Sequence, residues 1–130
     1  MIPRRKYGNK KIEFGGETFA SKGEWQRWLF LKDAEARGEI QGLRKQVEFI
    51  LLPTQYKNEV VHLKTKDKVV QRVAEREVTY IADFVYFKGP EMVVEDFKGF
   101  PDEKYPIKRK MMLYFNGVAI REVKKPTEPI

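Results

Sequence analysis

Along the first part of the chain, hydrophobic and polar residues alternate first with the spacing of β-strands and then with that of an α-helix. Short apolar runs on either side of Gly15-Gly16 predict two strands joined by a tight turn. Ser21 then stands where a helix N-cap is expected, and Glu24 three residues later completes a capping-box pattern. The helix is predicted to run to about Arg37 and to stop at Gly38. Its amphipathic face comprises Trp25, Trp28 and Leu29, with Leu31 and Lys32 as neighbours.

Strand patterns dominate the middle of the chain. Residues 46–51 predict a strand that ends at Pro53. In the charged segment 56–79, β-branched stretches at 60–63 and 69–73 predict two strands joined at a Lys-Asp-Lys turn. We expect a solvated β-hairpin arm here, with DNA or a second copy of the chain as the alternative contacts.

Two strands with stronger signals are predicted over residues 79–87 and 91–98. Both contain β-branched and aromatic residues, and a Gly-Pro pair turns the chain between them. A basic helix is expected from about Pro106 to Tyr114, followed by a turn, a short strand over 118–123 and a frayed tail over 124–130. The order β-α-β-arm-β-β-α-β predicts an α/β (mixed α+β) fold with a central mixed sheet flanked by helices.

The composition favours one folded domain over residues 1–130. Hydrophobic residues make up 42% of the chain, which is enough for a real core. The net charge of +7 favours a polyanionic partner such as nucleic acid. Residues 1–12 form a basic arm that carries Arg4, Arg5 and Lys6 ahead of the first acid. This arm is either a mobile, solvated terminus or a segment that grips phosphates.

The residue types exclude several classes of site. The chain has no Cys and a single His, which removes thiolate zinc sites, disulfides and Cys nucleophiles and argues against a His-centred triad. His62 falls in the charged arm, where we expect a surface position rather than a ligand. No apolar run approaches the length of a membrane span, and no secretory signal is recognisable. A cytoplasmic protein without a membrane partner or an organic cofactor is therefore expected.

Three charged residues interrupt the two strongest strands. Asp96 and Lys98 are two positions apart, so they share one face, whereas Glu95 and Phe97 share the other. Asp83 lies within the preceding strand, where an unpaired carboxylate is costly to bury. A short hairpin can bring Asp83 and Asp96 side by side, where they repel unless a cation lies between them. The alternative is a structural salt bridge between Asp96 and Lys98.

Carboxylates without Cys or His suit a hard cation. Mg²⁺ prefers a few carboxylates together with water and substrate phosphate oxygens, and Mn²⁺ accepts the same ligands. A lysine beside such a cation can orient a water molecule or help to deprotonate it, and it can stabilise charge on a phosphate. Two acids, a lysine and a divalent ion on a basic surface therefore predict a phosphodiesterase.

The second helix carries three consecutive basic residues, Lys108, Arg109 and Lys110. They either belong to an ordinary solvated face, since three consecutive side chains cannot all point one way, or bind phosphates at the border of the cleft. We favour phosphate binding because the helix follows the Asp96 strand closely. Tyr105 is either a packing residue or a phosphate contact.

The chain resembles the PD-(D/E)XK nuclease superfamily in the segments Ile81–Phe84 and Val94–Gly99. Within that superfamily it is most similar to a phage-encoded group related to Holliday junction resolvases and endonuclease-I-like enzymes. The matching pieces span most of the chain and are Lys6–Lys10, Ser21–Trp28, Gly38–Ile40, Gln46-Val47 and Tyr105–Met111.

The resemblance implies a restriction-endonuclease-like core and assigns roles to the charged residues. Asp83 and Asp96 would be metal ligands, and Lys98 the catalytic lysine. An acid on the first helix often reaches the metal in this superfamily, and Glu24 occupies that place, with its capping-box role as the alternative. Ala82 replaces the first Pro of the motif. Glu95 has the wrong spacing from Lys98 to take the role of Asp96.

The expected activity is that of a Mg²⁺-dependent DNA endonuclease, selective for branched DNA and acting as a homodimer in phage DNA recombination. Two alternatives are retained. One is a nicking or weakly specific endonuclease, and the other is a catalytically silent DNA-binding module with a nuclease-like fold.

Overall fold

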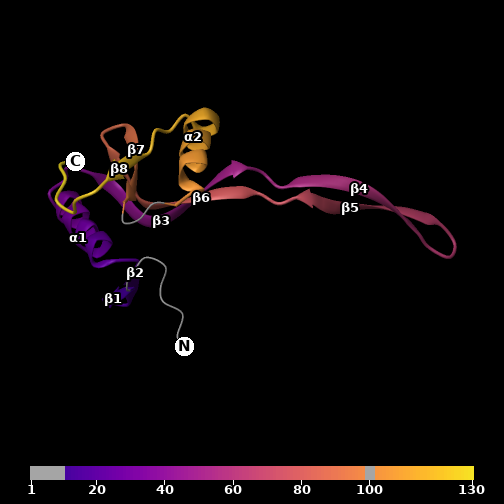
Figure 1. The fold of residues 1–130 in the computed structure, drawn as a ribbon, viewed down its shortest axis with the longest axis horizontal. Helices are drawn as coiled ribbons and strands as arrows, with labels where there is room; N and C mark the ends of the chain where they lie inside the picture. Colours follow the sequence, from indigo (N-terminus) through magenta and orange to yellow (C-terminus); the bar gives the residue numbers. More distant parts are fainter. Residues whose placement is uncertain (1–10, 99–101) are drawn as a thin grey trace.

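The computed structural model describes residues 11–98 and 102–130, so the predicted DNA contacts Arg4, Arg5 and Lys6 lie outside the described residues (Figure 1). It has a mixed α+β architecture, as predicted. The elements are β1 (Ile12–Phe14), β2 (Glu17–Phe19), α1 (Lys22–Ala36), β3 (Gln41–Leu52), β4 (Gln55–His62), β5 (Asp67–Glu75), β6 (Val78–Lys88), β7 (Glu91–Phe97), α2 (Tyr105–Asn116) and β8 (Arg121–Val123).

Four strands form the central sheet in the order β3-β6-β7-β8. β6 is antiparallel to both β3 and β7, whereas β7 and β8 are parallel. Parallel neighbours need a crossover, and α2 supplies it between β7 and β8. The prediction of a mixed sheet is therefore confirmed. β8 begins at Arg121 rather than at residue 118.

Helix α1 has the ends that its sequence predicts. The Ser21 hydroxyl accepts a hydrogen bond from the Glu24 amide at 3.2 Å, and Gly38 follows the helix with a φ of 78°. The buried face differs from the expected one, because it comprises Glu24, Arg27, Leu31 and Ala34. Leu29 is 43% exposed, so its assignment to the apolar face was wrong. It lies to one side of a buried stripe that contains two charged residues, Glu24 and Arg27.

The two helices cover opposite faces of the sheet with separate clusters. Tyr105 and Met112 of α2 pack with Tyr80 and Ala82, whereas Leu31 and Ala34 of α1 pack with the aromatic residues Phe84 and Tyr86. The ring of Trp28 stacks on that of Phe84, with centroids 6.0 Å apart. The described helices include none that is long and apolar enough to cross a membrane.

Strand β3 changes face at Gln46. In a regular strand Leu43, Val47 and Phe49 would point to the same side. Here Leu43 packs on the α1 cluster, whereas Val47 and Phe49 pack on the α2 cluster. Gln46 lies between them with a φ of 52°, a left-handed conformation that is uncommon for residues other than glycine. The position opposite Gln46 in the β3–β6 register is Asp83, because Lys45 pairs with Phe84 and Val47 with Ala82.

The segment beyond β8 is docked, although we expected residues 124–130 to fray. The Arg27 guanidinium donates to the carbonyls of Pro126 and Glu128, and Arg121 donates to that of Pro129. Ile130 packs against the α1 cluster. The segment is held because its backbone carbonyls accept hydrogen bonds from arginines at the edge of the core. Its polar composition did not reveal this role of the backbone.

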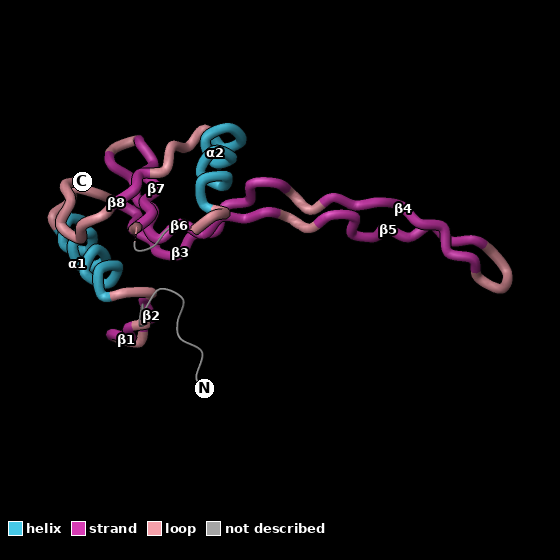
Figure 2. The backbone as a smooth tube through the Cα atoms, viewed as in Figure 1, coloured by secondary structure: helices cyan, strands magenta, loops and turns pink. Residues whose placement is uncertain are grey.

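Strands β4 and β5 form an antiparallel hairpin that projects from the central sheet (Figure 2). It continues β3 beyond Pro53 and returns into β6, which confirms the predicted hairpin arm. His62 is exposed on it, as expected, and its Nδ1 lies 2.7 Å from an Asp67 carboxylate oxygen.

Candidate active site

Asp83 lies where β6 and β7 separate. The two strands are paired from Lys88 and Glu91 as far as Phe84 and Glu95, and the next pair would be Asp83 and Asp96. Instead, the Asp83 carboxylate accepts the backbone N–H of Phe97 at 2.7 Å. A side chain thus replaces a backbone hydrogen bond, and it anchors Asp83 beside the strand segment that carries Asp96 and Lys98.

Asp96 and Lys98 point to the same side of β7, as the strand alternation predicts. The Lys98 Nζ lies 2.7 Å from an Asp96 oxygen, and the side chains are 22% and 14% exposed, respectively. The Tyr80 hydroxyl donates to the other Asp96 oxygen at 3.0 Å, and the Lys98 ammonium lies over the ring of Tyr105. These tyrosines belong to the α2 cluster, so the ion pair opens to solvent on the α2 side of the sheet.

Glu24 reaches the same region from the first turn of α1. The Gln46 side-chain amide donates to Glu24 at 3.1 Å, and the same nitrogen lies 3.5 Å from an Asp83 oxygen. Gln46 therefore links the helix acid to the strand acid. Sequence reasoning gave it no role, although the Gln46-Val47 pair was among the pieces of family resemblance.

The clustered carboxylates raise one another's affinity for protons. Burial, followed by the charges of Glu24 and Asp96, raises the pKa of Asp83 to about 8. Burial also raises the pKa of Glu24, against the opposing effects of the Ala20 backbone N–H and the Lys45 ammonium. A divalent cation near these acids would favour their ionised forms.

Glu24 serves the helix end and the acidic cluster together. Its backbone N–H bonds to Ser21, which is one half of a capping box, and its carboxylate accepts hydrogen bonds from the Ala20 backbone and from Gln46. The side chain is only 5% exposed. The capping and the catalytic interpretations therefore do not exclude each other.

Glu95 takes no part in the acidic cluster. It is fully buried on the α1 side, where Arg27 donates to both its oxygens, at 2.9 and 2.7 Å. The Tyr86 hydroxyl also donates to it, and Arg121 lies 3.6 Å away. This network holds α1 against β7 one helical turn after Glu24. Sequence reasoning missed Arg27, although a carboxylate on the apolar face of β7 required a basic partner.

The donor chemistry of the site fits a hard cation. Glu24, Asp83 and Asp96 provide oxygen ligands, and the Lys98 ammonium is paired with Asp96. In residues 11–98 and 102–130, however, no group of three or more His, Cys, Asp or Glu side chains is placed so that it could hold a metal ion. Lys98 and Tyr80 together engage both oxygens of Asp96.

The basic residues of α2 point in different directions. Arg109 lies 3.4 Å from Glu122 of β8 and near the Tyr105 ring, whereas Lys110 is exposed and Lys108 is half-buried. All three are on the helix that covers the Asp96 face of the sheet. Their predicted contact with phosphates stays a prediction.

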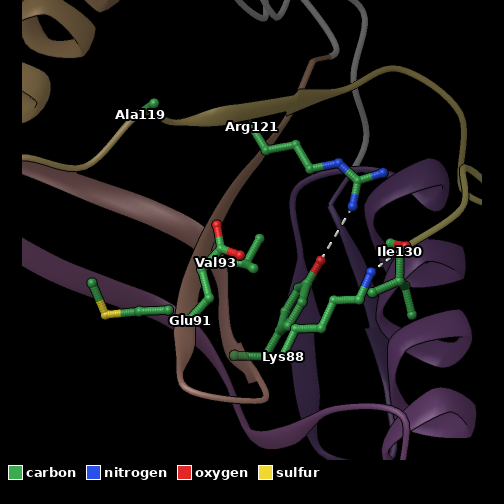
Figure 3. Close-up of a pocket in the computed structure, with 8 residues that line it drawn as sticks. Lys88, Glu91, Val93, Ala119, Arg121 and Ile130 are labelled. Atoms are coloured by element: carbon green, nitrogen blue, oxygen red, sulfur yellow. Dashed lines mark hydrogen bonds between the residues drawn. The ribbon is translucent and has the colours of Figure 1, made fainter.

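A separate pocket of about 250 Å³ lies beyond the buried network (Figure 3). Lys88 and Arg121 reach into it, with Lys88 donating to the Ile130 carbonyl at 3.1 Å and Arg121 to the Tyr86 hydroxyl at 3.4 Å. None of Glu24, Asp83, Asp96 and Lys98 lines it. Its cations are occupied by the docked C-terminal segment and by the core, so the acidic cluster is the better candidate site.

Comparison with protein families gives a match that covers residues 4–126. The chain belongs to this family, described as "Protein of unknown function (DUF1064)". No curated protein and no solved structure matches the chain.

Proposed function

We propose that this member of the DUF1064 family is a Mg²⁺-dependent DNA endonuclease whose active site comprises Glu24, Asp83, Asp96 and Lys98. The observation that carries the proposal is the convergence of three carboxylates and a lysine at the point where β6 and β7 separate. Core packing alone gives no reason to gather acids that raise one another's pKa. The net charge of +7 suits a polyanionic substrate.

Each residue has a chemical role in this proposal. Asp83, Asp96 and Glu24 would hold the cation, which supplies Lewis-acid stabilisation of negative charge on the phosphate when it is bound. Lys98 would then release its hold on Asp96 and use its ammonium to orient the attacking water and to stabilise the phosphate. Gln46 keeps the Glu24 and Asp83 carboxylates adjacent through its amide.

The substrate class follows from the family resemblance. Similarity to the PD-(D/E)XK superfamily, and to its Holliday junction resolvase-like members, favours branched DNA as the preferred substrate and a homodimer as the active form. Lys108, Arg109 and Lys110, together with Arg4, Arg5 and Lys6, are the proposed phosphate contacts.

Cleavage assays with three substrates test the proposal. A four-way junction, a linear duplex and a supercoiled plasmid are each incubated with Mg²⁺, Mn²⁺ or chelator. We expect product with either metal, none with chelator, and the fastest cutting of the junction. Equal rates on all three substrates would exclude selectivity for branched DNA and favour a weakly specific endonuclease.

The test needs a matched control for loss of charge. Glu122 is the β8 partner of Asp96 in the sheet register and is exposed. Asp96→Asn should remove cleavage, whereas Glu122→Gln should retain it. DNA binding without product from any substrate, with either metal, would instead identify a silent DNA-binding module.

A further inference from the structure

The β4–β5 hairpin carries an uneven distribution of charge. In its stem, Glu59 lies 3.1 Å from Arg72 and 3.7 Å from Lys57, so both of these cations have an acidic partner. Near the tip, Asp67 pairs with His62. The lysines of the turn and of the start of β5 form no ion pair within the described residues, and these are Lys64, Lys66 and Lys68.

The stem also exposes apolar side chains in cross-strand pairs. Val60 faces Val69, and Tyr56 faces Val73. These four side chains are 46–64% exposed, since only the two strands support each other along the stem. An isolated two-stranded ribbon is only marginally stable in water, so a binding partner would be expected to stabilise it.

We propose that the β4–β5 hairpin binds duplex DNA at a distance from the cut, with its lysine-bearing tip on the phosphates and its ribbon along the major groove. This groove is wide enough to admit a two-stranded ribbon. The unpaired lysines, rather than the apolar pairs, decide for DNA over a second copy of the chain, because two copies would place like charges together. The inference deepens the proposed function, on which it rests for the position of the cut.

The length of the arm sets the length of duplex that it contacts. The nine residues of β5 extend about 30 Å at roughly 3.4 Å per residue. At about 3.4 Å per base pair, this corresponds to roughly nine base pairs. The hairpin projects away from the central sheet (Figure 2). A duplex that ends near the active site would therefore miss the tip, whereas a longer duplex would reach it.

The test compares two variants that lose the same charge. Lys64→Ala/Lys66→Ala alters the tip, and Lys124→Ala/Lys125→Ala removes two exposed lysines near the C-terminal end. Binding is measured by fluorescence anisotropy in chelator, at several salt concentrations, with a long duplex of about thirty base pairs.

On the long duplex, the tip variant should bind more weakly, and the slope of log affinity against log salt should fall by about two. The Lys124/Lys125 variant should keep the wild-type slope. A wild-type slope in the tip variant on the long duplex would overturn the inference.

Binding in chelator separates this inference from the proposed function. A wild-type protein that shows the tip effect but cuts no DNA leaves the arm assignment standing without the endonuclease. Cleavage without a tip effect supports the endonuclease and contradicts the arm assignment. If Val60→Thr/Val69→Thr converts a dimer to a monomer and leaves DNA affinity unchanged, the arm belongs to a contact between copies and the inference fails.

Discussion

Glu95 and Asp96 are neighbours on β7, and each forms an ion pair, yet the surroundings of the two pairs differ. The Arg27–Glu95 pair is fully buried, and Tyr86 and Arg121 complete its contacts. The Lys98–Asp96 pair is partly exposed and lies beside two further acids whose pKa values are raised. A pair that is satisfied on all sides holds elements together, whereas a pair beside excess negative charge can exchange its partner for a cation or a substrate.

The largest expected effect comes from the partly exposed Lys98–Asp96 pair. Asp96→Asn keeps an acceptor for the Tyr80 hydroxyl but removes the charge, so cleavage should fall by about a thousandfold. The free energy of unfolding should change by less than about 1 kcal/mol, because the pair is partly exposed. Single-turnover cleavage and urea denaturation measure the two quantities. An Asp96→Asn protein that retains full cleavage would remove Asp96 from the site.

The buried Arg27–Glu95 pair should show the opposite result, with the larger effect on stability. Glu95→Ala leaves Arg27 in the core without its anion, and we expect a loss of about 3–5 kcal/mol in the free energy of unfolding. Glu91→Ala, at an exposed position of the same strand, is the control and should change it by less than about 0.5 kcal/mol. Urea denaturation monitored by tryptophan fluorescence gives both values. A stability loss no larger than that of the control would contradict a structural role for Glu95.

The contact of α1 with β7 links the two ion pairs, and a substitution at Gly23 can alter it without changing either pair directly. A Cβ at Gly23 would lie 2.8 Å from the Phe97 ring, so Gly23→Ala should force α1 away from β7. We expect a net loss of about 1–2 kcal/mol, since overpacking exceeds the helix-propensity gain of alanine. Cleavage should weaken as well, because Glu24 is the next residue. Gln26→Ala, at an exposed position of α1, is the control. Equal stability of the two variants would show that the Phe97 ring moves aside at no cost and would contradict the prediction.

The dependence of stability on pH also distinguishes Asp83 from the buried pair. Because the pKa of Asp83 rises from 3.8 to about 8 on folding, the folded state binds more protons than the unfolded state between these values. In chelator, this group should therefore lower the stability as pH rises from about 4 to 8. Asp83→Asn should flatten that dependence, and Mg²⁺ should oppose it in the wild type. Thermal melts over this range test the assignment, and identical slopes for both proteins in chelator would contradict it.

Local patterns predicted much of the fold. Ser21 and Gly38 gave the ends of α1, and strand alternation correctly separated Asp96 and Lys98 from Glu95. These features depend on residues close in sequence, where helix and strand periodicities apply.

Long-range features escaped prediction. The Arg27–Glu95 pair joins residues 68 positions apart, and helical periodicity does not name the partner of a buried charge. The left-handed backbone of Gln46 depends on the sheet around it, since glutamine has no intrinsic preference for that conformation. Docking of the C-terminal segment likewise depends on Arg27 of the distant helix α1, together with Arg121 of the neighbouring β8.

The hydrogen bonds of Arg27 also bear on the order of events during synthesis. Its partners Pro126 and Glu128 lie 99 and 101 residues downstream, so α1 emerges from the ribosome long before them. We expect the first helix to remain loosely attached until nearly the whole described chain has been translated, because contacts of such separation are slow to form. The acidic cluster, which depends on the seating of α1, would then be completed only at the end of folding, when the rest of the sheet is already in place.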